Sequence, residues 1–92
     1  MAASAQVTVT VGSVLLEYTG GRARLSAAGA TVGEALDALD RAHAGFKWRV
    51  VDEQGRLRPH MALFVNGAPV RDLKRPLRDG DDVRLLQALS GG

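Results

Sequence analysis

The chain ends in Leu89-Ser90-Gly91-Gly92, and this ending carries the simplest chemistry in the sequence. A terminal α-carboxylate is ionised at neutral pH, and two glycines leave it unhindered by side chains. Glycine also adopts backbone angles closed to other residues, so such a tail can thread a narrow channel. The alternative is an ordinary frayed chain end, which many domains have. The domain that precedes the tail decides between the two.

The other reactive side chains form no recognisable site. His43 and His60 are the only histidines, and neither has a companion at metal-ligand spacing. Three aspartates in residues 79–82 resemble part of a calcium loop but lack its spacing and its closing glutamate. No serine has the context of a nucleophile elbow, and no glycine pattern fits a nucleotide-binding loop. We therefore expect no catalytic residue and no metal site.

The composition excludes further classes. The absence of cysteine rules out disulfides, thiolate metal sites and a cysteine nucleophile, so any sulfur chemistry would need another atom. The 12 basic and 10 acidic residues are interspersed, and the four aromatic residues are not interleaved with a basic stripe, so we expect no nucleic-acid partner. The longest apolar run, Met61–Val65, is too short to span a membrane, and the first residues show no secretory signal. We expect a cytoplasmic protein without a membrane partner.

The 92 residues allow one small domain, whose pattern predicts strands and one main helix. Alternating residues predict strands over Gln6–Val11 and Arg22–Ala27. The capping box Thr31–Glu34 starts an amphipathic helix that runs from about Val32 to Ala44, with an apolar stripe of Val32, Ala35, Leu36, Leu39 and His43. Gly45 stands at a left-handed C-cap position. On the polar face of this helix, Asp37 and Arg41 have the spacing of an ion pair.

The second half of the chain predicts three more strands. Met61–Asn66 leads into an Asn66-Gly67 hairpin turn, and Ala68–Val70 returns as an edge strand because it contains Pro69. Val83–Ala88 is the last strand, while residues 14–18 and 46–51 are ambiguous. The fold class is therefore α+β: a roll with a mixed sheet of about five strands packed on one main helix. The first and last strands should lie side by side in the sheet centre.

Four segments together carry a family resemblance: Ala30–Glu34, Phe64–Gly67, Pro76–Val83 and Ala88–Gly92. The combination resembles ubiquitin-like β-grasp proteins, and more closely the sulfur carriers of the ThiS/MoaD type. The resemblance covers nearly the whole chain. It implies a β-grasp domain over residues 1–88 and a flexible tail over residues 89–92.

The resemblance also implies a function. The chain would be a carrier, not an enzyme, and would bind no cofactor itself. A ubiquitin-activating-like adenylating enzyme would use ATP to adenylate the Gly92 carboxylate, with Leu89, Ser90 and Gly91 threading the tail. A sulfur donor would then convert Gly92 to a thiocarboxylate, and a sulfur-accepting biosynthetic enzyme would take the sulfur. The missing cysteines agree with sulfur carried on the Gly92 carbonyl carbon.

Strand parity predicts a partner-binding patch beside the tail. Positions 83 and 85 should face the core, which leaves Arg84 and Leu86 outward. The alternation in residues 61–66 likewise leaves Phe64 outward. Outward apolar side chains on neighbouring strands form a candidate docking surface, unless the chain's own loops cover Phe64.

Two other functions start from the same features. The chain could be a protein modifier joined through Gly92 to lysines of other proteins, or a non-catalytic interaction subunit. A MoaD-type protein is both a carrier and the small subunit of molybdopterin synthase. The sequence leaves the sulfur acceptor open among molybdopterin, thiamine, cysteine, a thiolated nucleotide and a secondary metabolite.

Overall fold

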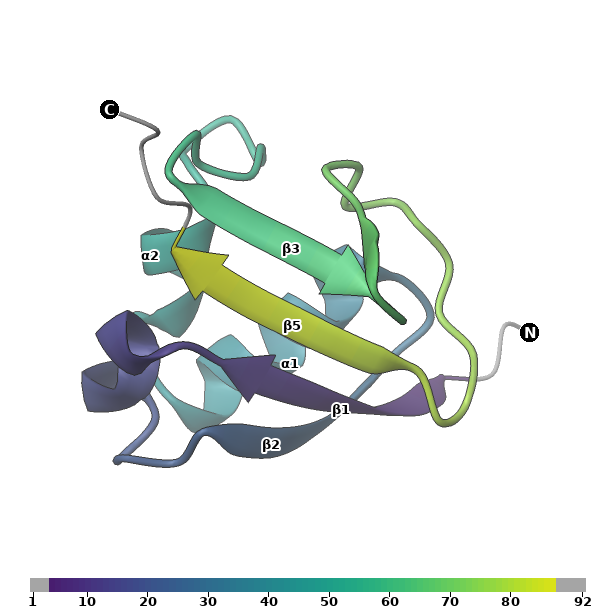
Figure 1. Ribbon diagram of the computed structural model, residues 1–92, viewed down its shortest axis with the longest axis horizontal. Coiled ribbons are helices and arrows are strands. Elements are labelled where there is room, and N and C mark those ends of the chain that lie inside the picture. Colours follow the sequence, from purple (N-terminus) through teal and green to yellow (C-terminus); the bar gives the residue numbers. More distant parts are fainter. Residues whose placement is uncertain (1–3, 88–92) are drawn as a thin grey trace.

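The computed structural model describes residues 4–87. One mixed sheet has the strand order β2-β1-β5-β3-β4. The strands are β1 (Ala5–Val11), β2 (Arg24–Gly29), β3 (Met61–Val65), β4 (Ala68–Pro69) and β5 (Asp82–Gln87). The helices are the 3₁₀ helix η1 (Ser13–Tyr18), α1 (Val32–Ala42) and α2 (Phe46–Val50). Both α-helices lie behind one face of the sheet, as Figure 1 shows. The predicted α+β roll on one main helix is confirmed.

The two central strands, β1 and β5, run parallel, and Val9 stands opposite Val83 in their register. The flanking pairs β1–β2 and β3–β5 are antiparallel. Both central strands alternate between buried and more exposed residues, because one face of the sheet is covered by helices and the other is open. The prediction that the first and last strands are neighbours is confirmed.

Helix α1 begins as its capping box predicts. The Thr31 hydroxyl accepts a hydrogen bond from the Glu34 N–H at 3.2 Å, and the Glu34 carboxylate accepts one from the Ala30 N–H at 3.0 Å. The helix ends at Ala42 rather than the predicted Ala44, because His43 leaves helical angles and caps the helix through its N–H. The helix is therefore two residues shorter than predicted, and its buried stripe ends at Leu39 because His43 is the C-cap.

The predicted pair of Asp37 with Arg41 is wrong. Asp37 instead forms an ion pair with Lys47 of α2, at 2.5 Å. Gly45 adopts the predicted left-handed backbone with φ of 92°, but it starts α2 rather than directly ending α1. The partner of Asp37 therefore comes from the neighbouring helix, which single-helix spacing rules do not consider.

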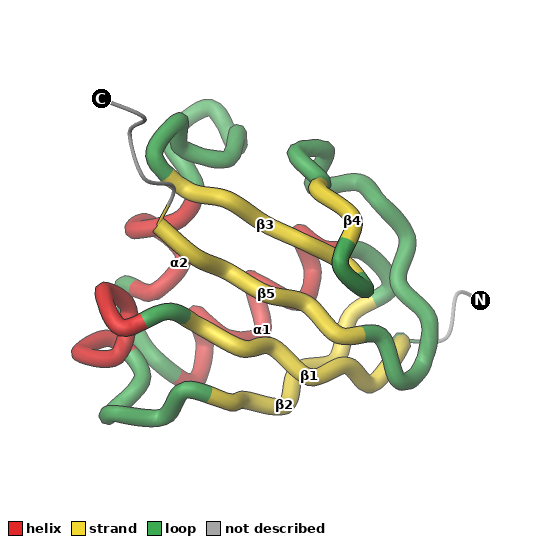
Figure 2. Tube along the Cα trace, viewed as in Figure 1, coloured by secondary structure: helices red, strands yellow, loops and turns green. Residues whose placement is uncertain are grey.

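Several predicted boundaries also move. The second strand is Arg24–Gly29 instead of Arg22–Ala27, and the edge strand stops at Pro69. The last strand begins at Asp82, and its predicted end, Ala88, lies outside the described residues. The hairpin turn is confirmed, with positive φ at both Asn66 and Gly67. The two ambiguous segments are the helices η1 and α2 (Figure 2).

The core lies between the sheet and the helices. Leu36 and Leu39 of α1, and Phe46 and Val50 of α2, are almost completely buried there. Helix α1 can approach β2 closely because Gly29 has no side chain: a Cβ at that position would lie 2.5 Å from the Ala35 nitrogen. No helix within residues 4–87 is long and apolar enough to cross a membrane.

Candidate functional site

The open face of the sheet carries the predicted patch of Phe64, Arg84 and Leu86. Phe64 stands opposite Arg84 in the β3–β5 register, and Leu86 stands opposite Ala62. Side chains two residues apart on one strand share a face, so Arg84 and Leu86 lie side by side along β5. The three residues thus form one surface near the end of β5, as strand parity predicts.

The members of this patch differ in exposure. Leu86 is 39% exposed and lies over Gly12, where a Cβ would come within 3.3 Å of its Cδ2. Phe64 is half-buried, with Pro69 of the edge strand opposite it on its other side. The Arg84 guanidinium pairs with the Asp82 carboxylate at 3.1 Å, and both groups are well exposed. The patch therefore offers mainly apolar contact, through Leu86 and Phe64. Its one cation, Arg84, is held only weakly, because its ion pair with Asp82 is exposed to solvent.

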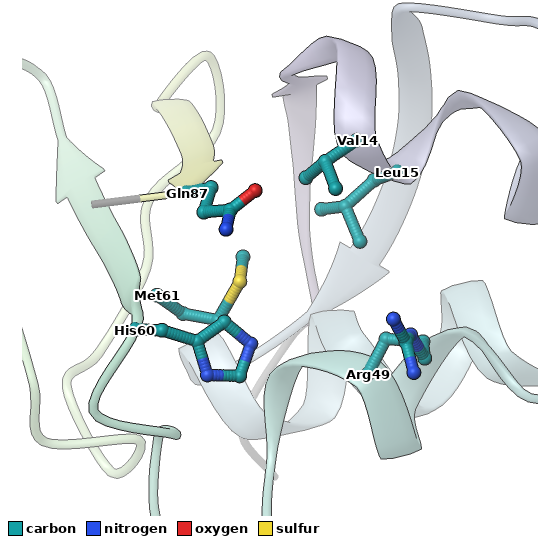
Figure 3. Close-up of a pocket in the computed structure, with 6 residues that line it drawn as sticks. All are labelled: Val14, Leu15, Arg49, His60, Met61 and Gln87. Atoms are coloured by element: carbon teal, nitrogen blue, oxygen red, sulfur yellow. The ribbon is translucent and has the colours of Figure 1, made fainter. Parts of the chain in front are cut away.

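A small cavity lies at the end of β5 on the opposite, helix-bearing side of the sheet. Its volume is about 60 Å³. Its lining residues come from η1, α2 and the ends of β3 and β5, and are Val14, Leu15, Arg49, His60, Met61 and Gln87 (Figure 3). We call it the tail-base pocket, since Gln87 is the last described residue before the predicted tail.

Helix α2 positions Arg49 at this pocket. The Asp40 carboxylate accepts hydrogen bonds from the Gly45 and Lys47 N–H groups at 3.2 and 3.0 Å, which fixes the start of the helix. Phe46 and Val50 are buried on one side of α2, so the opposite side of the helix, which carries Arg49, is exposed. The Arg49 guanidinium stacks 5.0 Å from the centre of the Tyr18 ring. Arg49 is thus held by packing rather than by an acidic partner.

The loop before β3 positions His60. The Arg71 guanidinium donates hydrogen bonds to the carbonyls of Leu57 and Met61 at 2.9 and 3.2 Å. The Met61 N–H in turn donates to the Arg58 carbonyl at 3.0 Å. These bonds fix the backbone of residues 57–61. The position of His60 in the pocket wall therefore depends on Arg71, which is more than ten residues away in the sequence.

Asp81 fixes the turn that starts β5. Its carboxylate accepts hydrogen bonds from the Arg78 N–H and from the Asn66 side-chain amide, both at 2.9 Å. The bond from the Arg78 backbone and then that from Asn66 stabilise the charged form, so the pKa of Asp81 lies below its ordinary value. The Asn66 oxygen accepts the Asp82 N–H at 2.9 Å. The aspartates of this turn therefore have structural partners.

The described residues 4–87 contain no cluster of three or more His, Asp or Glu side chains that could hold a metal ion. His43 sits at the end of α1, whereas His60 lines the pocket. The predicted tail residues Leu89, Ser90, Gly91 and Gly92 lie outside the described residues.

Sequence reasoning missed the tail-base pocket. Its residues come from four places in the chain, and residues 46–51 had no clear periodicity from which the orientation of Arg49 could be inferred. The available signal was composition: residues 47–60 contain four Lys or Arg and one His against two acidic residues. Such an excess indicates a basic surface but not its place beside β5.

Known proteins are similar to this chain over most of its length. The ThiS family model matches residues 9–92. The sulfur carrier protein CysO of Mycobacterium tuberculosis is 34% identical over 91 residues, which cover 94% of this chain and 98% of that protein. Small archaeal modifier protein 1 of Haloferax volcanii is 40% identical over 63 residues, 68% of this chain and 71% of the relative.

Solved structures agree with this match. The crystal structure of Mycobacterium tuberculosis CysO superimposes with a TM-score of 0.85 at 33% identity, covering 90% of this chain and 99% of that one. The BexX/CysO complex of Amycolatopsis orientalis gives a TM-score of 0.86 at 38% identity, covering 94% and 99%. With the predicted motifs, the ubiquitin-like β-grasp sheet and the family match all in agreement, the chain belongs to the ThiS family.

Proposed function

We propose that this protein is a sulfur carrier that acts as a substrate of other enzymes and not as a catalyst. The observation that carries the proposal is the family match over residues 9–92, which includes the Leu-Ser-Gly-Gly ending after β5. The similar protein from Mycobacterium tuberculosis is itself a sulfur carrier. This function needs no catalytic side chain in the carrier, because the reactive group is the main-chain carboxylate.

In the proposed reaction a partner enzyme adenylates Gly92 with ATP. A Gly92 carboxylate oxygen bonds to the α-phosphorus, and pyrophosphate leaves. Sulfide (HS⁻) then attacks the activated carbonyl carbon, AMP leaves, and loss of the remaining S–H proton gives the thiocarboxylate. Leu89, Ser90 and Gly91 thread the tail into the active site, where glycine avoids a clash with the channel. The ATP belongs to the partner, and the carrier holds no cofactor.

The partner classes follow from this cycle. An adenylating enzyme of the ubiquitin-activating type charges the tail, and a biosynthetic enzyme accepts the sulfur. We propose that both recognise the patch of Phe64, Arg84 and Leu86, since it lies on the open sheet face next to the tail. A relative of this chain forms a complex with BexX, which supports a role exercised through partners. We place the cycle in the cytoplasm, where ATP is available.

The test is chemical trapping of the tail. The chain is incubated with its adenylating enzyme, ATP and sulfide, and is then treated with a sulfonyl azide that reacts with thiocarboxylates. The proposal expects an adduct on the C-terminal peptide that depends on ATP. An unlabelled tail after complete ATP-dependent activation would contradict it.

A second candidate is a protein modifier joined through Gly92 to lysines. The similarity to small archaeal modifier protein 1 favours it. Both functions begin with adenylation, so the same incubation separates them: isopeptide adducts on other proteins support the modifier, and the thiocarboxylate supports the carrier. An interaction subunit that is not activated would give neither product.

A further inference from the structure

We propose that the tail-base pocket binds an acidic side chain of the adenylating enzyme, at the entrance to the channel that receives the tail. This inference rests on the proposed function and names a second contact for it, separate from the open-face patch.

The pocket lies close to the start of the tail, because Gln87 is one of its lining residues. Five residues, 88–92, separate Gln87 from the reactive carboxylate. An extended chain of that length spans at most roughly 17 Å. Any enzyme that takes the Gly92 carboxylate into its active site must therefore bring its surface within this distance of Gln87. The pocket wall includes Gln87, so the pocket lies close to the surface of that enzyme whenever the tail is engaged.

The two sides of β5 explain why one patch is not the whole contact. Leu86 points to the open face, whereas Gln87 lies with Val83 and Leu85 on the helix-bearing side. The tail begins between these two surfaces. A channel that surrounds the tail reaches both of them, and the pocket is the hollow on the second side.

The chemistry of the pocket selects its occupant. Val14, Leu15 and Met61 provide apolar wall, and Arg49, His60 and Gln87 provide hydrogen-bond donors, as Figure 3 shows. No Asp or Glu is among these lining residues. Arg49 stacks on Tyr18, and the ion pairs within residues 4–87 are Asp37–Lys47 and Asp82–Arg84, so no carboxylate of this part of the chain pairs with Arg49. A Glu or Asp side chain fits this combination, because guanidinium groups bind carboxylates through paired donors.

The size of the pocket agrees with such an occupant. A volume of about 60 Å³ holds one short side chain but not a nucleotide or a folded peptide. One of its apolar lining residues, Val14, is itself 41% exposed. Binding here would therefore combine one charged contact, at Arg49, with apolar contacts around it. Such a combination is common in interfaces where a charge pair fixes how two proteins align.

The experiment measures adenylation kinetics with charge-reversal variants. The enzyme used is the adenylating enzyme of the same organism, identified by ATP–pyrophosphate exchange that depends on this chain. Arg49→Glu should raise the KM for the carrier roughly tenfold and leave kcat within about twofold, because the tail itself is unchanged. Arg49→Lys should recover only part of the loss, because lysine keeps the charge but not the paired donors, and added salt should weaken the wild type more than Arg49→Glu.

The matched control is Arg78→Glu, which makes the same change in net charge in the turn at the opposite end of β5. It should leave KM close to that of the wild type. Equal KM values for the wild type and Arg49→Glu, or equal effects of the two reversals, would overturn the proposal. Thermal melts confirm that each variant is folded.

Histidine footprinting gives a second readout that does not depend on activity. Diethyl pyrocarbonate modifies accessible histidines, and the chain has two. On adding the enzyme and ATP, His60 should become protected while His43, at the end of α1, should not. Unchanged modification of His60 in a complex that still adenylates the wild type would reject the pocket contact. The absence of any adenylation of the wild type would instead reject the proposed function.

Discussion

Phe64 and Leu86 point to the open face of the sheet, so substituting them should affect binding more than folding. Leu86→Asp should weaken binding to the adenylating enzyme by at least tenfold and leave the fold intact, because the Leu86 side chain is exposed on the open face of the sheet. Phe64→Ala should act in the same direction with a small loss of stability, because Phe64 is half-buried. Calorimetric titration measures both affinities.

Ser26→Asp is the control for this prediction. Ser26 lies on the same open face but on β2, separated from β5 by the central strand β1. The control should bind like the wild type. If Leu86→Asp binds as tightly as Ser26→Asp, the patch does not contact the enzyme.

A core residue should behave in the opposite way to the patch residues: its substitution should affect stability rather than binding. Leu36 is 1% exposed within the helix–sheet core. Leu36→Ala should cost about 2–5 kcal/mol of unfolding free energy, since it removes buried methyl groups and leaves a cavity. Chemical denaturation measures this cost, and a loss below about 0.5 kcal/mol would show that α1 is not packed as described.

Strand parity gave these residue directions correctly because the period of a strand is two and only one face of this sheet is covered. The same reasoning placed Phe64 outward but could not predict its half-burial. That depends on the edge strand opposite it, whose contacts are not local in sequence. The pairing of Asp37 with Lys47 was missed for the same reason.

At the scale of elements, the contact between β2 and α1 depends on one glycine. A Cβ at Gly29 would lie 2.5 Å from the Ala35 nitrogen and 2.9 Å from the Glu34 backbone. Gly29→Ala should therefore push the helix from the sheet and destabilise the protein by about 1–3 kcal/mol. Denaturation with Ser26→Ala as the control tests this, because Ser26 is on the open side of the same strand. Equal stability of the two variants would contradict the close packing.

The turn before β5 should make stability depend on pH. The pKa of Asp81 is lowered in the folded protein, chiefly by its bond from the Arg78 N–H. A lowered folded pKa contributes stability that is complete above the unfolded value of about 4 and is lost as the pH falls through the folded pKa. Asp81→Asn should therefore lower the Tm by a few degrees at pH 7 and by much less at pH 2.

Glu53→Gln is the control, because it removes the same charge in the exposed turn at residues 53–54. Its Tm should match that of the wild type at pH 7. A Tm difference between the wild type and Asp81→Asn that is as large at pH 2 as at pH 7 would show that the charge of Asp81 does not matter.

The elements themselves were largely predictable, and the reasons are local. The capping box set the start of α1, and Asn66-Gly67 set the hairpin, because both depend on neighbouring residues. Helix α2 was not resolved from the sequence, since five residues are too few for a helical period. The pocket that α2 helps to form could not be predicted either.

At the scale of the whole molecule, the residues that stabilise the fold are different from the group proposed to react. The core of the described domain lies between the sheet and the helices, and β5 leads from its centre to the predicted tail. The patch on the open face and the tail-base pocket on the helix-bearing side flank this exit. A domain arranged in this way can present one reactive carboxylate to several partners without containing an active site of its own.

The most direct test of this account is the deletion of Gly92. Thermal melts of the wild type and the deletion variant should coincide, because a segment beyond the last strand is expected to bury little surface. The deletion withdraws the carboxylate by roughly 3.5 Å, and misplacement by about 1 Å can already cost a hundredfold in rate. Intact-mass analysis after incubation with the adenylating enzyme, ATP and a sulfur source should show one oxygen replaced by sulfur in the wild type only. If the deletion variant gains sulfur as readily as the wild type, the Gly92 carboxylate is not the carrier site and the account is wrong.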